Sequence, residues 1–444
     1  MWFSRSTLHI PFMGKAKYII GAVLVAIGLF WVLVWAGVVP GLRVIDKATI
    51  KKAKLVVWGT VDDTLVYQEL VKSFQGENPG VEVAYYKKAE DSYEQDLLRA
   101  FAAGDGPDIF SVHHTWLYRY SDLVFAAPKE IFPASEFRER FVDAAQKDFL
   151  FGENLFGVPL YTDTLALYYN IDLFNSAGIV FPPKDWDEFT QYSRALTKRK
   201  QSGDIVISGA AIGGGKNVVS SSDILAALMV QYGAALSDAN GRVNFRVGSM
   251  GGANSAEKAL EFYTSFAKQT KPNYSWSGTS LENSESMFAQ GRAAMMVGYA
   301  SAKTSIMKKS PRLRFSVAPF PQPKNATVKK NYADYWGYAV YKNSPSKDAA
   351  WQFLHFLSQQ NTSAYYASVT QRAGSQRSII ASQQEDPQMK IFAEQALSAV
   401  SWVQRDEKVI GQVFTDMIDA QIAGDQPLQQ TILNAEIKIN AMIK

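Results

Sequence analysis

From residue 54 onward, this 444-residue chain alternates between two patterns of hydrophobic residues, one typical of strands and one typical of helices. Residues 54–58 (KLVVW) form a short apolar run that is typical of a buried strand, and residues 81–85 and 108–112 predict two more strands. Hydrophobic residues recur at helical spacing within 67–74 and 97–101, and glycine or proline follows each stretch. This order of strands and helices predicts a parallel sheet with right-handed crossovers. Because ligands bind beyond the carboxyl ends of such strands, the loops after Trp58 and Val112 are candidate binding loops.

The same alternation continues along the rest of the chain, so the fold class that it predicts is α/β. Its length favours two or three domains. Further helices are expected at 223–232, 256–268, 282–290 and 347–357, and strands at 293–297 and 314–318. Residues 409–443 are expected to be helical except around 424–427, where glycine and proline interrupt the pattern.

Residues 18–39 (YIIGAVLVAIGLFWVLVWAGVV) carry no charged side chain. A helix of that length covers the hydrocarbon core of a bilayer, about 30 Å thick. The apolar region of a cleaved signal peptide is shorter and precedes a small-residue cleavage motif, which we do not find. We therefore predict an uncleaved transmembrane anchor at 18–39, a cytoplasmic segment at 1–17 and a tether at 40–52. Lysine and arginine flank both sides of the span, so these charges do not set its orientation.

Composition removes several classes of function. The net charge is +4 without a basic block, which argues against nucleic acid as a partner. Cysteine is absent, so disulfides, thiolate metal sites, a cysteine nucleophile and a lipidated cysteine anchor are excluded. The chain has only four histidines, of which His113 and His114 are adjacent. Because a zinc site needs three or four ligands, a site made of histidines alone is excluded, although carboxylates could complete one. We predict no metal site and, separately, no cofactor.

Several short motifs stand in a fixed order along the chain. They are AAGDGPDI at 102–109, FGVP at 156–159, LYYN at 167–170, WDEF at 186–189, MFAQGRAAM at 287–295, APFP at 318–321, GYAV at 337–340 and KDAAWQFL at 347–354. In this order and spacing, the series resembles the sugar-type extracellular solute-binding proteins of ABC importers, the group that includes maltose-binding protein. The resemblance covers about residues 53 to 444.

The resemblance implies a two-lobe, periplasmic-binding-protein-like fold that closes on a solute at a hinge. We expect lobe 1 to comprise 53–162 and 283–335, and lobe 2 to comprise 163–282 and 336–444. The chain should cross between the lobes near 161–165, 275–282 and 336. The family implies a monomeric receptor outside the cytoplasm, and the single-pass helix predicted at 18–39 would hold it at the cell membrane in place of the lipid tether of many relatives. Such a receptor captures a carbohydrate, here expected to be an oligosaccharide, presents it to permease subunits and carries out no chemistry. Two departures are Tyr335 and Trp336, where relatives often carry a glycine pair before Gly337, and residues 371–374, where a proline is common.

Aromatic residues make up 13% of the chain, and flat rings with polar groups at their edges suit the faces and hydroxyls of a sugar. The candidate ligand-binding residues follow predicted strands, lie in the expected crossing segments or stand in polar loops. They are Trp58, Asp62, His113, His114, Trp116, Tyr161, Asp163, Trp276, Tyr299, Tyr335, Trp336 and Arg372.

Each candidate also has a purely structural interpretation. Trp58 could be a core residue at a strand end, either Asp62 or Asp63 a helix cap, and Trp276 a plug in a surface loop. The same scaffold could instead bind a polyamine, a peptide or a phosphodiester. The carboxylates of Asp62, Asp63 and Asp163 would suit a cationic solute. A glycosidase that uses Asp62 and Asp163 is a further possibility, for which the carboxylates would have to stand about 5–10 Å apart.

Overall fold

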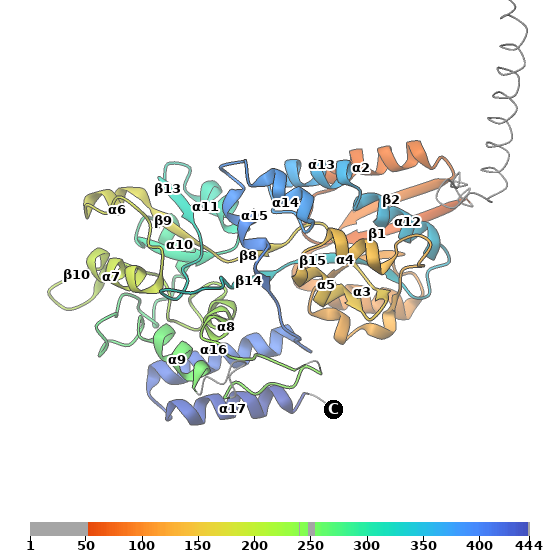
Figure 1. Ribbon diagram of the computed structural model, residues 1–444. Coiled ribbons are helices and arrows are strands. Elements are labelled where there is room, and N and C mark those ends of the chain that lie inside the picture. The colour runs from red at the N-terminus through yellow and green to blue at the C-terminus, as the bar shows by residue number, and fades with distance from the viewer. Residues whose placement is uncertain (1–51, 239, 247–253, 443–444) are drawn as a thin grey trace, which may run out of the picture. The chain divides into compact units, whose positions relative to one another are not determined.

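The computed structural model describes residues 52–238, 240–246 and 254–442. Lys54–Lys444 form one compact unit, and Figure 1 shows their arrangement. The predicted anchor and cytoplasmic segment lie outside the described residues, as does all of the tether but its last residue. Within the described ranges, no helix is both long and apolar enough to span a bilayer.

The first lobe is built on a six-stranded sheet with helices on both sides (Figure 1). β1 and β3 pair in parallel, with Val57 opposite Ile109, as the sequence predicts. All five residues of β3 are buried, which is consistent with apolar side chains at Ile109, Phe110 and Val112 on both faces of the strand. The strands run in the order β2 (Val81–Lys87), β1 (Ala53–Gly59), β3 (Ile109–His113), β15 (Trp336–Tyr341) and β4 (Val124–Phe125), and β7 (Val158–Pro159) also pairs with β15. The helices are α2 (Thr64–Glu77), α3 (Glu90–Ala103), α4 (Ala134–Arg140), α5 (Asp143–Phe149), α12 (Lys347–Leu357), α13 (Gln360–Thr370) and α14 (Arg377–Gln383), with the turns η1 (Trp116–Tyr118) and η2 (Ser121–Leu123) and the hairpin of β5 (Leu150–Phe151) and β6 (Asn154–Leu155).

The second lobe contains smaller sheets. β9 (Ala166–Asn170) lies between β12 (Met295–Gly298) and β13 (Phe315–Ala318), and β14 (Asn331–Asp334) lies between β8 (Asp163–Thr164) and β16 (Ala399–Val400). β10 (Lys198–Arg199) pairs with β11 (Ile205–Ile207). The helices are α6 (Ile171–Ser176), α7 (Trp186–Leu196), α8 (Ser221–Gln231), α9 (Ser255–Thr264), α10 (Ser284–Ala289), α11 (Ser301–Lys309), α15 (Lys390–Ala396), α16 (Glu407–Ala423) and α17 (Leu428–Asn440).

The strand pairing reverses the expected assignment of two later segments to the lobes. β12 pairs with β9, so the segment placed in lobe 1 at 283–335 belongs to the second lobe. β15 pairs along its length with β3, so the part of 336–444 that begins with β15 belongs to the first lobe. The expected bounds are therefore wrong for these segments. Helical and strand periods do not report which distant strand is the partner, because pairing is not a local property.

Two of the three expected crossings agree with the strand pairings. β7 pairs with β15 and β8 with β14, so the chain leaves the first lobe between them, and it returns between β14 and β15. The expected crossing at 275–282 is wrong, because Ser275 donates to the Ala210 carbonyl oxygen and the Trp276 backbone N–H donates to Phe266 within the second lobe. The chain crosses once more, from the first lobe to the second, through residues 384–389 between α14 and α15.

Caps explain where two helices of the second lobe begin and where one of them ends. The side chain of Asp185 accepts the Glu188 N–H ahead of α7, and Asp406 accepts the Val409 N–H ahead of α16. Gly424 ends α16 with φ +76°, a left-handed conformation that glycine adopts readily. The α16 N-terminus is therefore fixed in position by its own cap.

Gly209 provides a test of packing in the second lobe. A Cβ built at this position would overlap the Ser193 carbonyl oxygen and lie 2.6 Å from Thr197 Oγ1, at the end of α7. We expect Gly209→Ala to lower the free energy of unfolding by about 3 kcal/mol, the upper part of the range for overpacking. Thermal or urea unfolding measures the change.

Gly76→Ala is the matched control, because a Cβ at Gly76 meets nothing within 4 Å. Its stability should stay within about 1 kcal/mol of the wild type. Equal stability of the two variants would contradict the close approach of α7 to residue 209.

Candidate functional site

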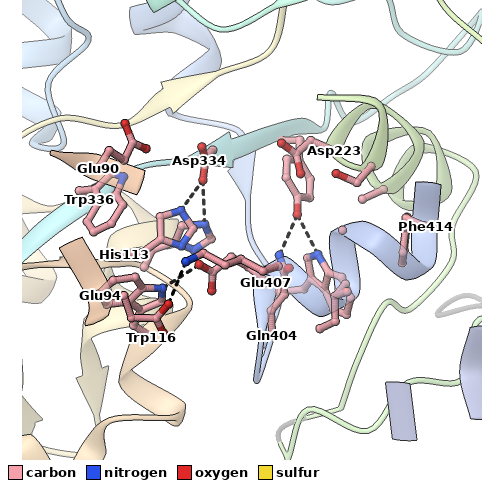
Figure 2. Close-up of a pocket in the computed structure, with 18 residues that line it drawn as sticks. Glu90, Glu94, His113, Trp116, Asp223, Asp334, Trp336, Gln404, Glu407 and Phe414 are labelled. Carbon is pink, nitrogen blue, oxygen red and sulfur yellow. Dashed lines mark hydrogen bonds and ion pairs between the residues drawn. The ribbon is translucent and has the colours of Figure 1, made fainter. Parts of the chain in front are cut away.

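A cavity of about 330 Å³ lies between the two lobes (Figure 2). The first lobe contributes the loop after β3, part of α3 and the first residue of β15. The second lobe contributes β14, α8 and the start of α16. The lining residues are Glu90, Glu94, His113, His114, Trp116, Ser222, Asp223, Ala226, Tyr332, Asp334, Trp336, Trp402, Gln404, Glu407, Lys408, Ile410, Gly411 and Phe414.

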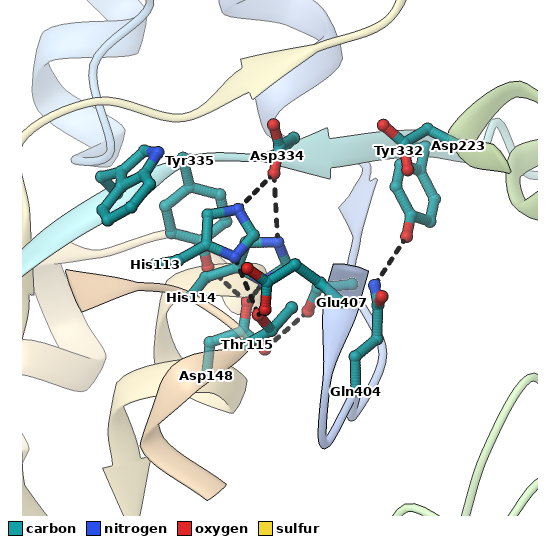
Figure 3. Close-up of polar contacts among 12 residues, drawn as sticks. His113, His114, Thr115, Asp148, Asp223, Tyr332, Asp334, Tyr335, Gln404 and Glu407 are labelled. Atoms are coloured by element: carbon teal, nitrogen blue, oxygen red, sulfur yellow. Dashed lines mark hydrogen bonds and ion pairs between the residues drawn. The ribbon is translucent and has the colours of Figure 1, made fainter. Parts of the chain in front are cut away.

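Two histidines at the end of β3 face one carboxylate across the junction of the lobes (Figure 3). The His113 Nε2 atom lies 2.6 Å from Asp334 Oδ1, and His114 Nε2 lies 3.6 Å from the same oxygen. The two rings are buried, whereas Asp334 is half-buried. Burial raises the pKa of Asp334, but the charges and hydrogen bonds of both histidines outweigh burial and hold that pKa well below its usual range.

Asp148, in α5, supports this pair from the first lobe. Its carboxylate accepts hydrogen bonds from Tyr335 Oη at 2.6 Å and Ser401 Oγ at 2.7 Å, and lies 3.1 Å from His114 Nδ1. Burial lowers the pKa of His114, but its contacts with Asp148 and then Asp334 raise that pKa to about 9. His114 is therefore protonated at neutral pH.

The first turn of α16 connects the lobes. Glu407 accepts hydrogen bonds from Thr115 Oγ1 at 3.2 Å and from the Trp116 indole N–H at 2.9 Å. On either side of Glu407, Asp406 pairs with Arg119 at 3.1 Å and Lys408 pairs with Glu94 at 2.9 Å. We call residues 406–408 the α16 latch.

The opposite wall of the cavity belongs to the second lobe. Tyr332 Oη accepts hydrogen bonds from the Trp402 indole N–H at 2.8 Å and from Gln404 Nε2 at 3.1 Å. Burial and then the charge of Asp334 raise the pKa of Asp223, which accepts a hydrogen bond from Tyr299 Oη at 3.0 Å. This wall thus combines an indole, a phenol and a carboxyl group.

Four of the twelve predicted ligand-binding residues line this cavity, namely His113, His114, Trp116 and Trp336. Two more lie directly behind the lining. Tyr335 stacks on His114 with ring centres 4.8 Å apart, and Tyr299 is hydrogen-bonded to Asp223.

Three others form a separate cluster in the first lobe. Asp62 pairs with Arg372 at 3.1 Å and accepts a hydrogen bond from Tyr366 Oη at 2.8 Å. The Arg372 guanidinium lies 4.6 Å from the centre of the Tyr161 ring. Burial raises the pKa of Asp62 despite the opposing charge of Arg372. The structural interpretation as a helix cap fits the position of Asp63, the N-cap residue of α2, although its side chain makes no capping hydrogen bond. It does not fit Asp62, which has the partners described above.

The remaining three lie outside the cavity lining. The Trp276 ring is 1% exposed, and its indole N–H donates to Asn217 Oδ1 at 2.9 Å, so it has no free face for a sugar. Lys88 covers the Trp58 ring, with Nζ 3.6 Å from the ring centre. Asp163 Oδ1 accepts the N–H groups of Thr164 and Ala300 at 2.8 and 3.0 Å.

Sequence reasoning missed most of the second-lobe wall, including Asp223, Tyr332, Asp334, Trp402 and Glu407. Asp334 stands directly before two residues that were predicted, and Trp402 is an aromatic residue in a stretch without helical period. These two positions could therefore have been predicted from the sequence. Nothing local marks Asp223 or Glu407, because acidic residues in the first turn of a helix are ordinary.

Residues 58–360 match the family of bacterial extracellular solute-binding proteins. The chain belongs to this family. This solute-binding protein is 26% identical over 309 residues to a putative binding protein of Brucella abortus, an alignment that covers 69% of this chain and 71% of the relative. It is 23% identical to the mannitol-binding protein of Pseudomonas aeruginosa, with 70% of each chain covered.

The fold of the solute-binding protein is also that of a solved relative. The cyclic α-maltosyl-1,6-maltose binding protein of Arthrobacter globiformis superimposes with a TM-score of 0.72 at 16% identity, over 88% of this chain and 99% of that one. This likeness agrees with the two-lobe α/β architecture predicted from the sequence.

The α16 latch predicts that Glu407→Ala shifts the lobes toward a more open arrangement. Its carboxylate accepts two hydrogen bonds from the other lobe, and bonds to a charged group contribute about 1.5–3 kcal/mol each. We expect the ratio of open to closed molecules to rise at least about tenfold. Because the chain has no cysteine, Lys72→Cys and Lys200→Cys place one spin label on each lobe, and pulsed EPR measures their separation.

Asp416→Ala is the control on the same helix, since Asp416 accepts from Gln412 within α16. Its distance distribution should match that of the unsubstituted labelled protein. A Glu407→Ala distribution that also matches would show that the latch does not hold the lobes.

Asp163 predicts a specific dependence of stability on pH. Burial raises its pKa to about 7, above its value of about 4 in an unfolded chain. The folded state therefore binds more protons than the unfolded state, and the contribution of Asp163 to stability falls as the pH rises from about 4 to about 7. Asp163→Asn keeps an Oδ1 acceptor for both N–H groups without the charge. The variant should be more stable than the wild type above pH 7, and the difference should shrink toward pH 4. Thermal melts across this range measure it, and parallel curves would contradict the assignment.

Proposed function

We propose that this protein is a receptor that captures a carbohydrate in the cavity between its lobes and delivers it to an ABC permease. One observation carries the proposal: the cavity presents three indole rings beside carboxylate, amide and ammonium groups. The rings are those of Trp116, Trp336 and Trp402.

The arrangement of the rings suits a sugar. Trp116 and Trp336 meet edge to face, with ring centres 5.1 Å apart and planes at 69°. Two rings at this angle form a corner against which the apolar face and edge of a pyranose can pack. Trp402 belongs to the other lobe, so closure brings it toward the solute.

Hydrogen-bonding groups line the rest of the cavity. Asp223 and Glu407 accept from hydroxyl groups, Lys408 donates, and Gln404 does both. A volume of about 330 Å³ is at the lower end of the range for small-molecule sites. The cavity therefore suits one or two sugar rings, and a longer oligosaccharide would need a more open arrangement.

The relatives support the same class of solute. One is a mannitol-binding protein, and a solved structure with the same fold is a cyclic maltosyl-maltose binding protein. Both solutes are uncharged and carry many hydroxyl groups. The function proposed for this chain is capture without turnover, so we expect no glycosidase activity.

We further infer that residues 18–39 anchor the receptor in the membrane with both lobes outside the cytoplasm. The absence of charged side chains over that span supports an anchor, and membership of an extracellular family supports the side. Cysteine, the usual site of a lipid anchor, is absent, so the helix would replace it.

A cationic solute is the second candidate, which the acidic lining favours. Glu90, Glu94, Asp223, Asp334 and Glu407 all border the cavity. An amine such as a polyamine would bind with an affinity that falls as the salt concentration rises, whereas a neutral sugar would bind almost independently of salt.

Trp336→Ala tests the site. Loss of a stacked indole should weaken sugar binding by about 2 kcal/mol, which is about thirtyfold in Kd. Titration calorimetry with mannitol, maltose and maltotriose measures the affinity. Trp276→Phe is the matched control, because Trp276 is buried within the second lobe, away from the cavity lining. A larger loss of sugar affinity in Trp276→Phe than in Trp336→Ala would show that the sugar binds elsewhere. The absence of binding heat or thermal shift with every sugar would refute a carbohydrate as the solute.

A further inference from the structure

Three ligand-type atoms converge at one corner of the cavity. The metal-binding atoms of His113, His114 and Asp334 all lie within 4.8 Å of one another. Each histidine directs Nε2 toward Asp334 Oδ1, at 2.6 and 3.6 Å (Figure 3). Ligands about 2.0–2.1 Å from a tetrahedral zinc ion stand about 3.3 Å apart, so the observed separations bracket that value. A shift of about 1 Å or less would bring each of these two pairs to that spacing. The two histidine ligand atoms, which lie within 4.8 Å of each other, would have to reach it as well.

The other nitrogen of each ring is already bound, as in metal centres. His113 Nδ1 lies 2.8 Å from Thr115 Oγ1, and that hydroxyl donates onward to Glu407. His114 Nδ1 lies 3.1 Å from Asp148 Oδ2, and Asp148 accepts from two hydroxyl groups as well. Each Nδ1 donates to its own partner, so a metal ion would bind at Nε2, where it displaces the proton that each ring directs at Asp334. Outer carboxylates and hydroxyls that orient histidine ligands in this way are a regular part of zinc sites.

The three residues also leave a position open toward the cavity. All of them line it, and Trp336 and Glu407 stand nearby (Figure 2). Three protein ligands with a fourth position open to water or a solute are the pattern of accessible zinc sites. The donor set of two imidazoles and one carboxylate suits Zn²⁺, Ni²⁺ or Co²⁺, whereas Mg²⁺ and Ca²⁺ prefer oxygen ligands alone.

We propose that His113, His114 and Asp334 form a binding site for one divalent transition-metal ion such as Zn²⁺. The two histidines belong to the first lobe and the aspartate to β14, so the ion joins the lobes at the cavity. It therefore stabilises their closed arrangement. The site does not depend on which solute the receptor captures.

Titration calorimetry tests the proposal with the full chain in detergent, without a histidine tag, after EDTA treatment. We expect one ZnCl₂ per chain to bind, and MgCl₂ to give no comparable signal. His114→Gln and Asp334→Asn should each weaken zinc binding at least tenfold. The control is His355→Gln, because His355 pairs with Glu136 at 2.9 Å and does not line the cavity. It should bind zinc like the wild type, and the absence of cysteine keeps the background low.

Two further measurements are needed. One distinguishes the loss of a metal-binding side chain from misfolding of the variant, and the other distinguishes failure of the metal site from failure of the proposed solute. Each variant is melted without metal, and the visible spectrum of the CoCl₂-loaded wild type should show tetrahedral coordination that is absent in a folded His114→Gln protein. Sugar titration of the EDTA-treated wild type is run in parallel. Sugar binding without zinc binding overturns the metal site alone, and zinc binding without sugar binding overturns the proposed solute alone. Zinc binding that survives both substitutions, or is lost in His355→Gln, overturns the site.

Discussion

The pairing of β15 with β3 is the constraint on which the cavity depends. Its register sets Trp336 opposite His113, so the last residue of one strand and the first of the other share one edge of the sheet. Asp334 is only two residues earlier, yet it pairs with Asp163 in a sheet of the second lobe. A change of one residue in this register would turn Trp336 to the opposite face of the sheet and carry Asp334 out of reach of the histidines. The lobes therefore meet at a position fixed by backbone hydrogen bonds.

Buried charged groups at the same junction favour the closed arrangement of the lobes. The Asp148 carboxylate accepts hydrogen bonds from two hydroxyl groups in addition to its contact with His114, and Asp334 faces both imidazoles. A buried carboxylate is tolerated only when donors satisfy it, and several of these donors lie in the other lobe from the acceptor. The α16 latch extends the contact at a helix N-terminus, where the helix dipole favours the negative charges of Asp406 and Glu407. Closure thus satisfies groups that an open arrangement leaves to water.

Local patterns predicted the elements well because they depend on neighbours in sequence. The helix at 347–357 has the predicted bounds. The partner of β15 could not be predicted, since the apolar run at 337–340 would suit a buried strand in either lobe. Trp276 stands among polar residues, which suggests an exposed loop, but Asn217 satisfies its indole N–H inside the second lobe. Asp223 and Tyr332 reach the cavity only through the tertiary fold. The loop after β3 was found because one general rule, that ligands bind at the carboxyl ends of parallel strands, applies to it directly.

Several polar groups of the cavity already have partners within the protein, and these bonds affect what can bind. Glu407 holds Trp116 and Thr115, and Tyr332 holds Trp402 and Gln404. A solute that takes over one of these bonds gains only the difference between the new bond and the old one, so a single hydroxyl contributes little net affinity. A solute with several hydroxyls in a fixed ring can replace several bonds at once and also cover the indole faces. A solute that separates one of these pairs but lacks a hydroxyl to replace the bond leaves a buried group unsatisfied, and this penalty is larger than the gain from a correct bond. Selectivity in this cavity therefore comes from the cost of unpaired groups more than from the strength of any one contact.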